Sequence, residues 1–598
     1  MSQQLLSKLR QHQGLVINLG FFCLSLLAVL PFWLTMHVYS GPDLQFHLSR
    51  IEEMLVNLQN GAPFSHIATR TFNQIGDAVV ACYPWIWLYI FAGLRFVLSP
   101  ISAIYFAYVL VVFTTLVIAY YSMKLVSKSS KISFYFAILY GLTTYLVMEI
   151  ITTQFGEFLA YPFIPLAFAG LYEVMFEDIN RWYLLTIGVT GIMYAHAPTT
   201  LIVVIALLVF YLAFFAKQPV QERAARLTKI GIAAVYSLIL SLIVWGPIAV
   251  LTMSQKLMRP NPQTLYADPQ SLFTWLNQSL ANKGIGLILL LLLIFGGFFI
   301  KRVPPIGRYA YFSSLVTLFV LSNLFPWNLI HHIPLLNGIE AIQSGHRIIP
   351  VLVMFIAAFG SYLLATQFSR RTFGVSALVI VARLCLINSF DYSAMYSMNV
   401  ATDQNPYDNQ FNRTSQPELT YKATPTHQIP RSNLNLQNYK VNNQDYQNQF
   451  PTDNGSGRTD YLPVTAGKHI DDLANKVTIL NGQRFEIATA SLHPGNNSLA
   501  YQLTVPMKKG TTLDLPFVHY AGMNYTVKFN GRTIQKPTTS NRGTFKLTIP
   551  QTVKQAKISI QSHGVKFNVL FVALSIVGWL GLLGLGLVRK YRKRINLS

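Results

Sequence analysis

Runs of about twenty apolar residues recur along the chain, and a helix of that length crosses the hydrocarbon core of a bilayer. This feature limits the possible fold more than any other. Twelve segments have this character, and the chain is therefore predicted to be a polytopic α-helical membrane protein whose spans are 14–36, 102–122, 132–149, 158–176, 182–195, 198–216, 230–252, 284–300, 309–325, 348–367, 372–390 and 567–588.

The composition agrees with this prediction. Hydrophobic residues make up 52% of the chain and charged residues only 12%, whereas soluble domains carry about a quarter charged residues. The net charge of +23 would suggest nucleic acid binding in a soluble protein, but in a multispan protein it indicates cationic cytoplasmic loops. A soluble enzyme, a disordered tail protein and a disulfide-stapled domain are excluded, and no nucleic-acid partner is expected. The three cysteines, Cys23, Cys82 and Cys385, have no metal-ligand spacing.

The cationic clusters predict the orientation. If residues 83–98 do not cross the membrane, nearly all of these clusters fall on one side, and if the segment crosses, they face outward. Because Lys and Arg favour cytoplasmic loops, 83–98 is predicted to be a juxtamembrane segment of the outer leaflet. Both termini are then cytoplasmic, in a bacterial cell membrane. The clusters that decide this are KLVSKSSK (124–131), KQPVQERAARLTK (217–229), KRVPPIGR (301–308), SRR (369–371) and RKYRKR (589–594).

The weakest predicted span is 372–390, because it contains Arg383. An arginine within the membrane is costly unless it faces protein or a water-filled cavity. The segment 14–36 follows a basic N-terminus, but it is too long for a signal peptide and lacks a small-residue cleavage site, so it is interpreted as the first span.

The predicted domains follow from these spans and from strand patterns. Seven alternating segments between residues 476 and 562, separated by turn signals such as NG, PGNN and KKG, are typical of an antiparallel β-sandwich. The division is a transmembrane domain at 1–390 with a long first outer loop at 37–101, an irregular Asn/Gln-rich segment at 391–470, an extracytoplasmic β-sandwich at 471–566, and a final span with a basic tail at 567–598.

The first candidate site lies just after span one. Apolar residues at helical spacing predict a helix that begins near residue 43. Asp43, His47 and Arg50 share one stripe of this helix, and a carboxylate, an imidazole and a guanidinium together suit acid–base chemistry beside a phosphate. The alternative is that Asp43 only caps the helix and pairs with Arg50.

The second candidate site is the short outer loop between the third and fourth spans. Glu149 precedes this loop and Glu157 opens the next span. A carboxylate at the outer boundary of the membrane is a candidate for function. Alternatively, Glu157 stabilises the N-terminus of its helix through the helix dipole.

Histidines and an arginine complete the candidate residues on the outer side. His196 lies in the turn between the fifth and sixth spans, where a hydrogen-bonded turn residue is the common alternative. His346 and Arg347 lie at the start of the tenth span. Arg347 suits bidentate phosphate binding, or alternatively extends its side chain to lipid headgroups. No P-loop, dinucleotide glycine motif, Gly-x-Ser-x-Gly or HExxH is present, so no nucleotide cofactor is expected.

Three stretches carry a resemblance to a known architecture: GPDLQFHLSRIEEM (41–54), YPWIWLYIFAGL (83–94) and QFGEFLAYPFIPLAF (154–168). With LPFVHYAGMNYTVKFNG (515–531) and the final span, the chain resembles the GT-C superfamily of polytopic glycosyltransferases. More narrowly, it resembles the bacterial YfhO-like membrane proteins, some of which are labelled 6-pyruvoyl-tetrahydropterin-synthase-related. The metal-binding histidine triad of a pterin enzyme is missing.

The resemblance implies an extracytoplasmic transferase. Its donor would be a polyprenyl-phosphate-linked sugar, and its acceptor a cell-envelope glycopolymer or glycolipid, for example teichoic acid. Asp43 would match the first-loop catalytic carboxylate, Glu157 the second-loop acidic position, and His346 and Arg347 the donor-phosphate contacts. A divalent cation such as Mg²⁺ or Mn²⁺ is a possible cofactor, although the paired Asp-x-Asp motif of the oligosaccharyltransferase branch is replaced by Glu149 and Glu157. The alternatives are a lipid-linked glycan flippase and a non-catalytic envelope-assembly protein.

Overall fold

The structure is a computed structural model of the 598-residue chain. It describes residues 13–40, 44–152, 154–258, 271–333, 342–369, 372–388, 420–424, 427–430, 439–441, 443–446, 459–535 and 537–595. Two compact units form, and both are discontinuous in sequence. Unit 1 comprises Met1–Tyr39, Ile101–Leu238 and Pro262–Thr402, and unit 2 comprises Ser40–Pro100, Ile239–Asn261 and Asp403–Ser598. The predicted domain boundaries at 390, 470 and 566 stay predictions.

Seven helical segments are long and apolar enough to cross a membrane, which makes the chain a polytopic helical membrane protein. In the part of the chain that the structure describes, they are Gln13–Trp33, Pro100–Ser127, Phe155–Phe176, Ala197–Lys217, Val220–Ser254, Gly345–Gln367 and Asn568–Arg589. An eighth span results if Ser130–Gly141 and Thr144–Ile150, which are bent by 41° at a short break, are counted together.

The sequence predicts about twelve spans, and four of these correspond to shorter helices. A pair of glycines marks one early end, because α15 ends at Gly296 and a 3₁₀ turn starts at Gly297. The count of twelve therefore stays a prediction, whereas seven or eight spans are described. The four shorter helices are α11 (Trp182–Met193), α15 (Leu287–Gly296), α16 (Pro305–Leu321) and α19 (Phe373–Val381).

Two sequence expectations concern single features of these helices. Arg383 lies in a π-helical turn, Ala382–Ile387, and its Nη1 donates to Asn388 Oδ1 at 3.0 Å, so this guanidinium has a protein partner.

Within the segment 83–98, which is predicted not to cross the membrane, the helix is α5 (Leu88–Leu94), in unit 2. Seven residues of helix span only about 10 Å, which is too short to cross a hydrocarbon core of about 30 Å.

Glycines bring two helices of unit 1 into close contact. α10 (Ile164–Phe176) packs along α11. A Cβ atom at Gly170 would lie 2.2 Å from Leu185 N, and one at Gly188 would lie 2.5 Å from Ala167 N. Membrane helices associate through such small residues because lipid provides no hydrophobic driving force between them. This contact fixes the span that carries Glu157.

The cationic loops of unit 1 meet at one end, which we name the cationic end. Lys128 Nζ lies 3.6 Å from Glu177 Oε2, and Lys217 Nζ donates to Tyr309 Oη at 2.9 Å. Further contacts join the same loops: Arg226 Nη1 to Val174 O at 2.7 Å, Lys131 Nζ to Ala365 O at 2.8 Å and Arg302 Nη1 to Gln367 Oε1 at 3.3 Å.

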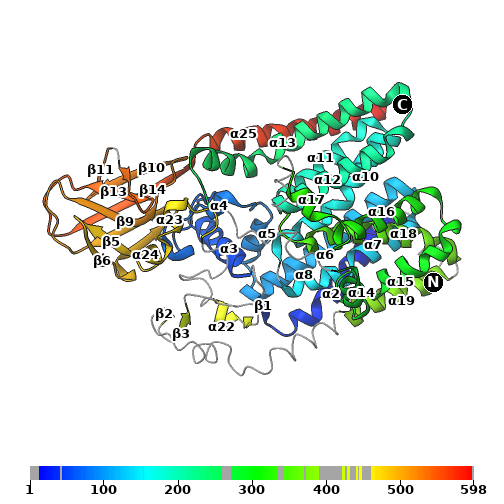
Figure 1. Cartoon of the computed structure of the whole chain (residues 1–598), viewed down its shortest axis with the longest axis horizontal. Helices are drawn as coiled ribbons and strands as arrows, with labels where there is room; N and C mark the ends of the chain where they lie inside the picture. The colour runs from blue at the N-terminus through cyan, green and yellow to red at the C-terminus, as the bar shows by residue number, and fades with distance from the viewer. Residues whose placement is uncertain are drawn as a thin grey trace. The chain divides into compact units, whose positions relative to one another are not determined.

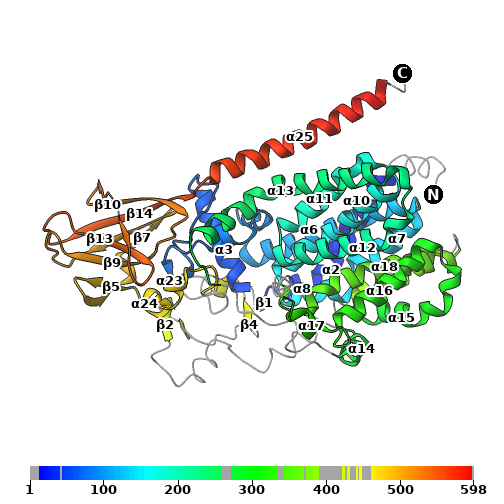
Figure 2. The same cartoon turned by 45° about the horizontal axis from the view of Figure 1, so that its top comes forward.

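Two spans run from this end to the opposite end of unit 1. The segment Phe155–Phe176 comprises α9 (Phe155–Ala160), a 3₁₀ turn and α10, and its last residue precedes Glu177. α18 (Ile349–Gln367) follows the 3₁₀ turn η8 (Gly345–Ile348), and its last residue, Gln367, lies at the cationic end. α16 packs along α18 (Figure 2). Glu157 and His346 therefore both lie at the end opposite the cationic loops.

The C-terminal part of the chain forms two five-stranded antiparallel sheets before the last helix (Figure 1). One sheet has the order β11-β10-β14-β8-β7 and the other β12-β13-β9-β5-β6. The strands are β5 (Val477–Leu480), β6 (Gln483–Glu486), β7 (Leu492–Gly495), β8 (Ser498–Leu503), β9 (Thr512–Val518), β10 (Met523–Phe529), β11 (Arg532–Thr533), β12 (Thr538–Thr539), β13 (Thr544–Thr548) and β14 (Ala556–Val565).

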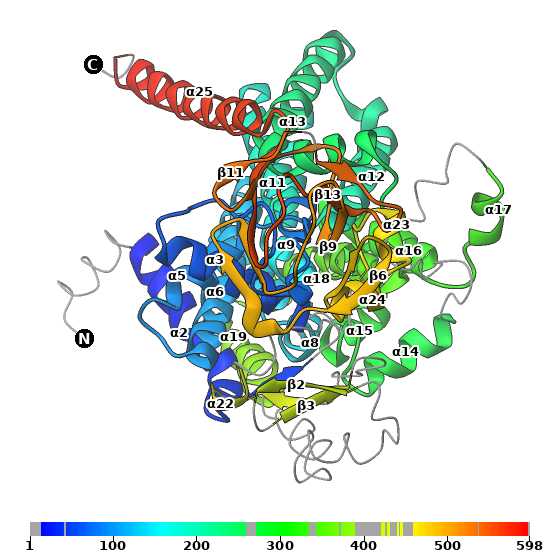
Figure 3. The same ribbon diagram turned by 90° about the vertical axis from the view of Figure 1, so that its left-hand side faces the viewer.

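One hydrophobic cluster takes side chains from both sheets, including Leu515 and Phe517 of β9 and Ile558 and Ile560 of β14. All seven predicted strand segments contain strands, and the prediction of a two-sheet β domain is confirmed. The segment 484–492 divides, because β6 pairs with β5 in one sheet and β7 pairs with β8 in the other. α25 (Asn568–Ile595) follows β14 as one continuous helix (Figure 3).

The glycine contact leads to a prediction on stability. Gly188→Leu places a side chain against the backbone of Ala167, so the free energy of unfolding is expected to fall by about 1–3 kcal/mol. The midpoint of thermal unfolding in detergent measures this. Gly231→Leu is the matched control, because a Cβ atom at Gly231 meets nothing within 4 Å. Equal midpoints for the two variants would contradict the proposed role of Gly188.

Candidate functional site

Four of the sequence-predicted residues come together in unit 1. Glu149 lies in the last turn of α8 (Thr144–Thr152), and Glu157 lies in the first turn of α9 after a short break. His346 and Arg347 belong to η8, where the Ser344 side chain caps the turn by accepting a hydrogen bond from the His346 N–H at 3.4 Å. The break between α8 and α9 therefore brings the two glutamates close to the two cationic residues of η8, although these residues are far apart in sequence.

The side chains of this cluster are in direct contact. His346 Nε2 lies 3.5 Å from Glu149 Oε1 and 3.3 Å from Glu157 Oε2. Arg347 Nε lies 2.9 Å from Glu157 Oε1, which is a charge-assisted hydrogen bond. His346 therefore bridges the two carboxylates, and Glu157 joins the histidine to the arginine.

Burial differs between the two halves of the cluster. The carboxylates are almost fully buried, with side-chain exposures of 2% for Glu149 and 4% for Glu157. His346 and Arg347 are partly exposed, at 31% and 18%. Buried carboxylates need cationic or hydrogen-bonding partners, and here the partners lie on the accessible side. An anionic ligand that approaches this side meets the guanidinium and the imidazole first.

The sequence analysis missed Tyr145. This buried tyrosine donates a hydrogen bond from its hydroxyl to Glu157 Oε2 at 3.1 Å, and its ring centroid lies 6.3 Å from that of His346. Tyr145 precedes Glu149 by four residues on α8, so both project from the same face of the helix. That spacing is the signal that could have found it.

The cluster has the features of a cation site. It is the one group of three His, Cys, Asp or Glu side chains, among the described residues, whose candidate ligand atoms all lie within 4.8 Å of one another. Glu149 Oε2 is buried and has no hydrogen-bond partner in the described part of the chain. Two ligand atoms that each lie about 2.1 Å from a tetrahedrally coordinated ion are roughly 3.4 Å apart. The distances from His346 Nε2 to Glu149 Oε1 (3.5 Å) and to Glu157 Oε2 (3.3 Å) match this separation.

The donor set also indicates which ion fits. One imidazole and two carboxylates suit Mn²⁺ or Zn²⁺, whereas Mg²⁺ prefers oxygen ligands and retains several waters. Glu149, Glu157 and His346 are therefore the residues that could hold a divalent ion.

The first-loop candidates lie in unit 2. Asp43 lies outside the described residues. α3 (Leu44–Gln59) agrees with the predicted helix, and its His47 and Arg50 are both buried. Arg50 Nη2 donates to the carbonyl oxygens of Tyr83 at 2.9 Å and Pro84 at 2.6 Å.

The charge states of these two residues follow from burial. Burial lowers the pKa of Arg50 to about 10, so the guanidinium stays charged at neutral pH. Burial, together with the nearby Arg50 charge, lowers the pKa of His47 well below its usual value, so its imidazole is neutral. The predicted role of His47 and Arg50 in phosphate binding stays a prediction.

His196 is the N-cap residue of α12 (Ala197–Phe214). Its Nδ1 lies 2.8 Å from Thr199 Oγ1, and its side chain is buried. This local contact is the one expected of a hydrogen-bonded turn histidine, and a role for His196 in substrate binding stays a prediction.

Comparisons with solved structures find distant structural likenesses. ArnT from Cupriavidus metallidurans, in a crystal structure bound to undecaprenyl phosphate, is 13% identical, with 67% of this chain and 68% of that chain covered and a TM-score of 0.34. No protein-family model and no curated protein matches the chain. The function of this chain therefore has to be inferred from its own side chains.

The carboxylate–histidine cluster leads to a prediction on metal binding. The full-length protein is expected to bind Mn²⁺ or Zn²⁺ after treatment with a chelator. Glu149→Gln and His346→Ala should each weaken binding by more than about 100-fold, because losing a ligand exceeds the 10- to 100-fold effect of an outer-shell change. Affinity should also fall as the pH is lowered, because protons compete for the ligands. Isothermal titration calorimetry measures both effects.

His469→Ala is the matched control, because His469 is an exposed histidine outside the cluster. The cation assignment fails if the wild-type protein binds no ion, or if all three variants lose affinity equally.

Proposed function

We propose that the chain is an extracytoplasmic glycosyltransferase of the GT-C type in a bacterial cell membrane. It would transfer a sugar from a polyprenyl-phosphate-linked donor to a cell-envelope glycopolymer or glycolipid such as teichoic acid. The observation that supports this proposal is the cluster in which His346 and Arg347 face the accessible side of two buried carboxylates. The resemblance of residues 41–54 and 154–168 to GT-C sequences adds to it.

The chemistry of an inverting transfer sets two requirements. An acceptor oxygen forms a bond to the anomeric carbon while the bond from that carbon to the donor phosphate breaks. The acceptor loses its hydroxyl proton to a base, and the bonding electron pair leaves with the phosphate. The site must therefore supply a proton acceptor and must stabilise a growing negative charge on the phosphate.

Arg347 and His346 are suited to the second requirement. A guanidinium matches the geometry of phosphate oxygens and keeps its charge. Glu157 holds Arg347 at 2.9 Å and also receives the Tyr145 hydroxyl, so the arginine is oriented before the donor binds. Such preorganised charge costs no reorganisation at the moment of reaction. A divalent ion held by Glu149, Glu157 and His346 would supply further positive charge to the phosphate oxygens.

Asp43 is the expected proton acceptor. The GT-C resemblance assigns this role to the first-loop carboxylate. Glu157 is held by both Arg347 and His346. Its role is to orient these two side chains, whereas Asp43 would receive the acceptor proton.

The distribution of charge in unit 1 supports an active face outside the cell. The cluster lies at the end opposite the cationic end, where Lys128, Lys217 and Arg302 make their contacts. Cationic loops favour the cytoplasm. This supports the proposal that the cluster lies on the outer face, where lipid-linked sugars would be used after they have been flipped across the membrane.

Replacement of Arg347 tests the phosphate contact. In proteoliposomes with a radiolabelled polyprenyl-phosphate sugar, Arg347→Ala is expected to lower the transfer rate by about 100- to 1000-fold, as for other groups that stabilise transition-state charge. Arg347→Lys keeps a positive charge beside Glu157 and so preserves the fold. It lacks the planar guanidinium that binds two phosphate oxygens at once, so its transfer rate should also fall strongly. Arg302→Ala, at the cationic end, should leave the rate unchanged.

The same assay distinguishes the alternative functions. Movement of the donor across the bilayer without a new glycosidic bond would identify a flippase. If the reconstituted protein is folded, as its unfolding midpoint shows, but neither forms a glycosidic product nor moves the donor across the bilayer, it would be a non-catalytic envelope-assembly protein.

Asp43→Asn tests the proton acceptor separately. The variant keeps the size of the side chain but removes the charge, so transfer should fall sharply while donor binding persists. Envelope sugar content in cells and donor binding to the purified protein are the two measurements. Unchanged sugar content with normal insertion of the protein would show that Asp43 is not the base.

A further inference from the structure

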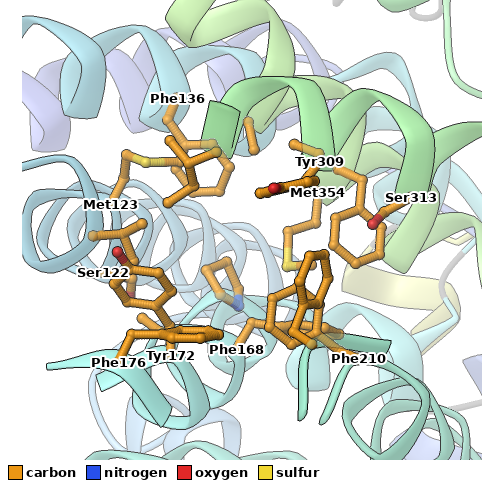
Figure 4. Close-up of a pocket in the computed structure, with 18 of the residues that line it drawn as sticks. Ser122, Met123, Phe136, Phe168, Tyr172, Phe176, Phe210, Tyr309, Ser313 and Met354 are labelled. Carbon is orange, nitrogen blue, oxygen red and sulfur yellow. The ribbon is translucent and has the colours of Figure 1, made fainter. Parts of the chain in front are cut away.

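A cavity lies at the cationic end of unit 1, away from the carboxylate cluster. Its volume is about 470 Å³, within the range of pockets that bind small molecules. The last turns of α6 (Pro100–Ser127) and α12, the first turns of α16, one side of α10 along its length and the middle of α18 surround it. Figure 4 shows aromatic and aliphatic side chains directed into the space from these helices, among them Phe168, Phe210 and Met354.

The wall of this cavity suits a hydrocarbon chain. Most of its lining side chains are aromatic or aliphatic. Two helices at its border also face outward, since α12 exposes Leu208 and Leu212, and α16 exposes Phe312 and Val316. In a membrane these surfaces lie against lipid chains, so an acyl chain can enter the cavity from the bilayer without crossing water.

Two charged residues border the cavity, Glu177 and Lys217. Glu177 Oε2 lies 3.6 Å from Lys128 Nζ, and the same ammonium lies 3.5 Å from Glu173 Oε1. Lys217 donates to Tyr309 Oη at 2.9 Å, and its ammonium lies 5.1 Å from the centroid of that ring. Neither contact neutralises the charge of Lys217, and it forms no ion pair with any residue that the structure describes. Lys217 is therefore a cation at the rim of an otherwise apolar cavity whose charge is available to an anionic ligand.

We propose that this cavity binds one acyl chain of an anionic phospholipid from the cytoplasmic leaflet, with the phosphate held by Lys217. Charge complementarity selects the headgroup, because basic sites at the cytoplasmic side of transmembrane helices attract anionic lipids. Apolar contact with the aromatic wall retains the chain. The site lies at the opposite end of unit 1 from Glu157 and Arg347, and it does not depend on the proposed sugar transfer.

The binding site would also stabilise the bundle. α12 meets α16 at the cavity, where the ring centroids of Phe214 and Tyr309 are 5.0 Å apart. An acyl chain between these helices fills space that would otherwise lack packing contacts. Bound lipid is therefore expected to raise the midpoint of thermal unfolding.

Native mass spectrometry of the full-length protein in detergent tests the proposal. The protein is titrated with phosphatidylglycerol, which is anionic, or with phosphatidylcholine, which has no net charge. Wild type is expected to bind phosphatidylglycerol more tightly. Lys217→Gln should lose about 5-fold in affinity for phosphatidylglycerol, the effect of one lysine near a membrane surface, and should bind phosphatidylcholine as before.

Two further variants distinguish lipid binding in the cavity from general electrostatic attraction of lipid to the cationic end. Ala358→Phe places a ring in the space that Ala358 lines, so it should weaken binding of both lipids while the protein still unfolds cooperatively. Lys301→Gln removes another exposed lysine of the cationic end that does not line the cavity, and it should bind both lipids like wild type.

Several results would overturn the proposal. Equal binding of the two lipids by wild type, or equal losses in Lys217→Gln and Lys301→Gln, would indicate a general layer of lipid around a cationic surface. Unchanged binding in Ala358→Phe would exclude the cavity. Binding of undecaprenyl phosphate that excess phosphatidylglycerol cannot displace would assign the cavity to an isoprenoid lipid instead.

Discussion

Two carboxylates buried at one end of a helical membrane unit are the constraint around which the candidate site is built. Burying a charge is costly unless a partner compensates it, and Glu149 and Glu157 are both buried. His346 and Arg347 supply the compensation from almost two hundred residues further along the chain. The ion pairs therefore connect α8 and α9 to the start of α18, and the proposed function uses the same groups to bind a phosphate.

The two ends of unit 1 have different chemistry. The cluster end combines buried acids with partly exposed cations, and it has one buried carboxylate oxygen, Glu149 Oε2, that accepts no hydrogen bond from the described residues. The cationic end combines paired loop charges with an apolar cavity and with Lys217, which has no ion pair among the described residues. A membrane protein that handles lipid-linked substrates needs contact with both a polar headgroup and a hydrocarbon environment. The proposed functions assign a sugar phosphate to one end and a structural lipid to the other.

The first-loop helix shows why an amphipathic pattern is ambiguous. The sequence predicts a helix that begins near residue 43 and a stripe of His47 and Arg50 suited to chemistry beside a phosphate. α3 (Leu44–Gln59) agrees with the predicted start, but both of these side chains are buried in unit 2, and Arg50 donates to two backbone carbonyls. A polar stripe on a helix looks the same in sequence whether it faces water, a substrate or other protein groups. Only the contacts of each side chain distinguish these cases.

The sequence by itself determined the elements whose signals are local. Apolar runs predict the long spans because backbone groups in lipid must be hydrogen-bonded within a helix, and alternation predicts the strands of the β domain because successive side chains face opposite sides of a sheet. It also named Glu149, Glu157, His346 and Arg347 individually. Only the tertiary structure joined them, added Tyr145, divided residues 484–492 between two sheets, and formed the cavity beside Lys217. The joined cluster and the cavity depend on contacts between residues far apart in sequence, and periodicity carries no information about such pairs.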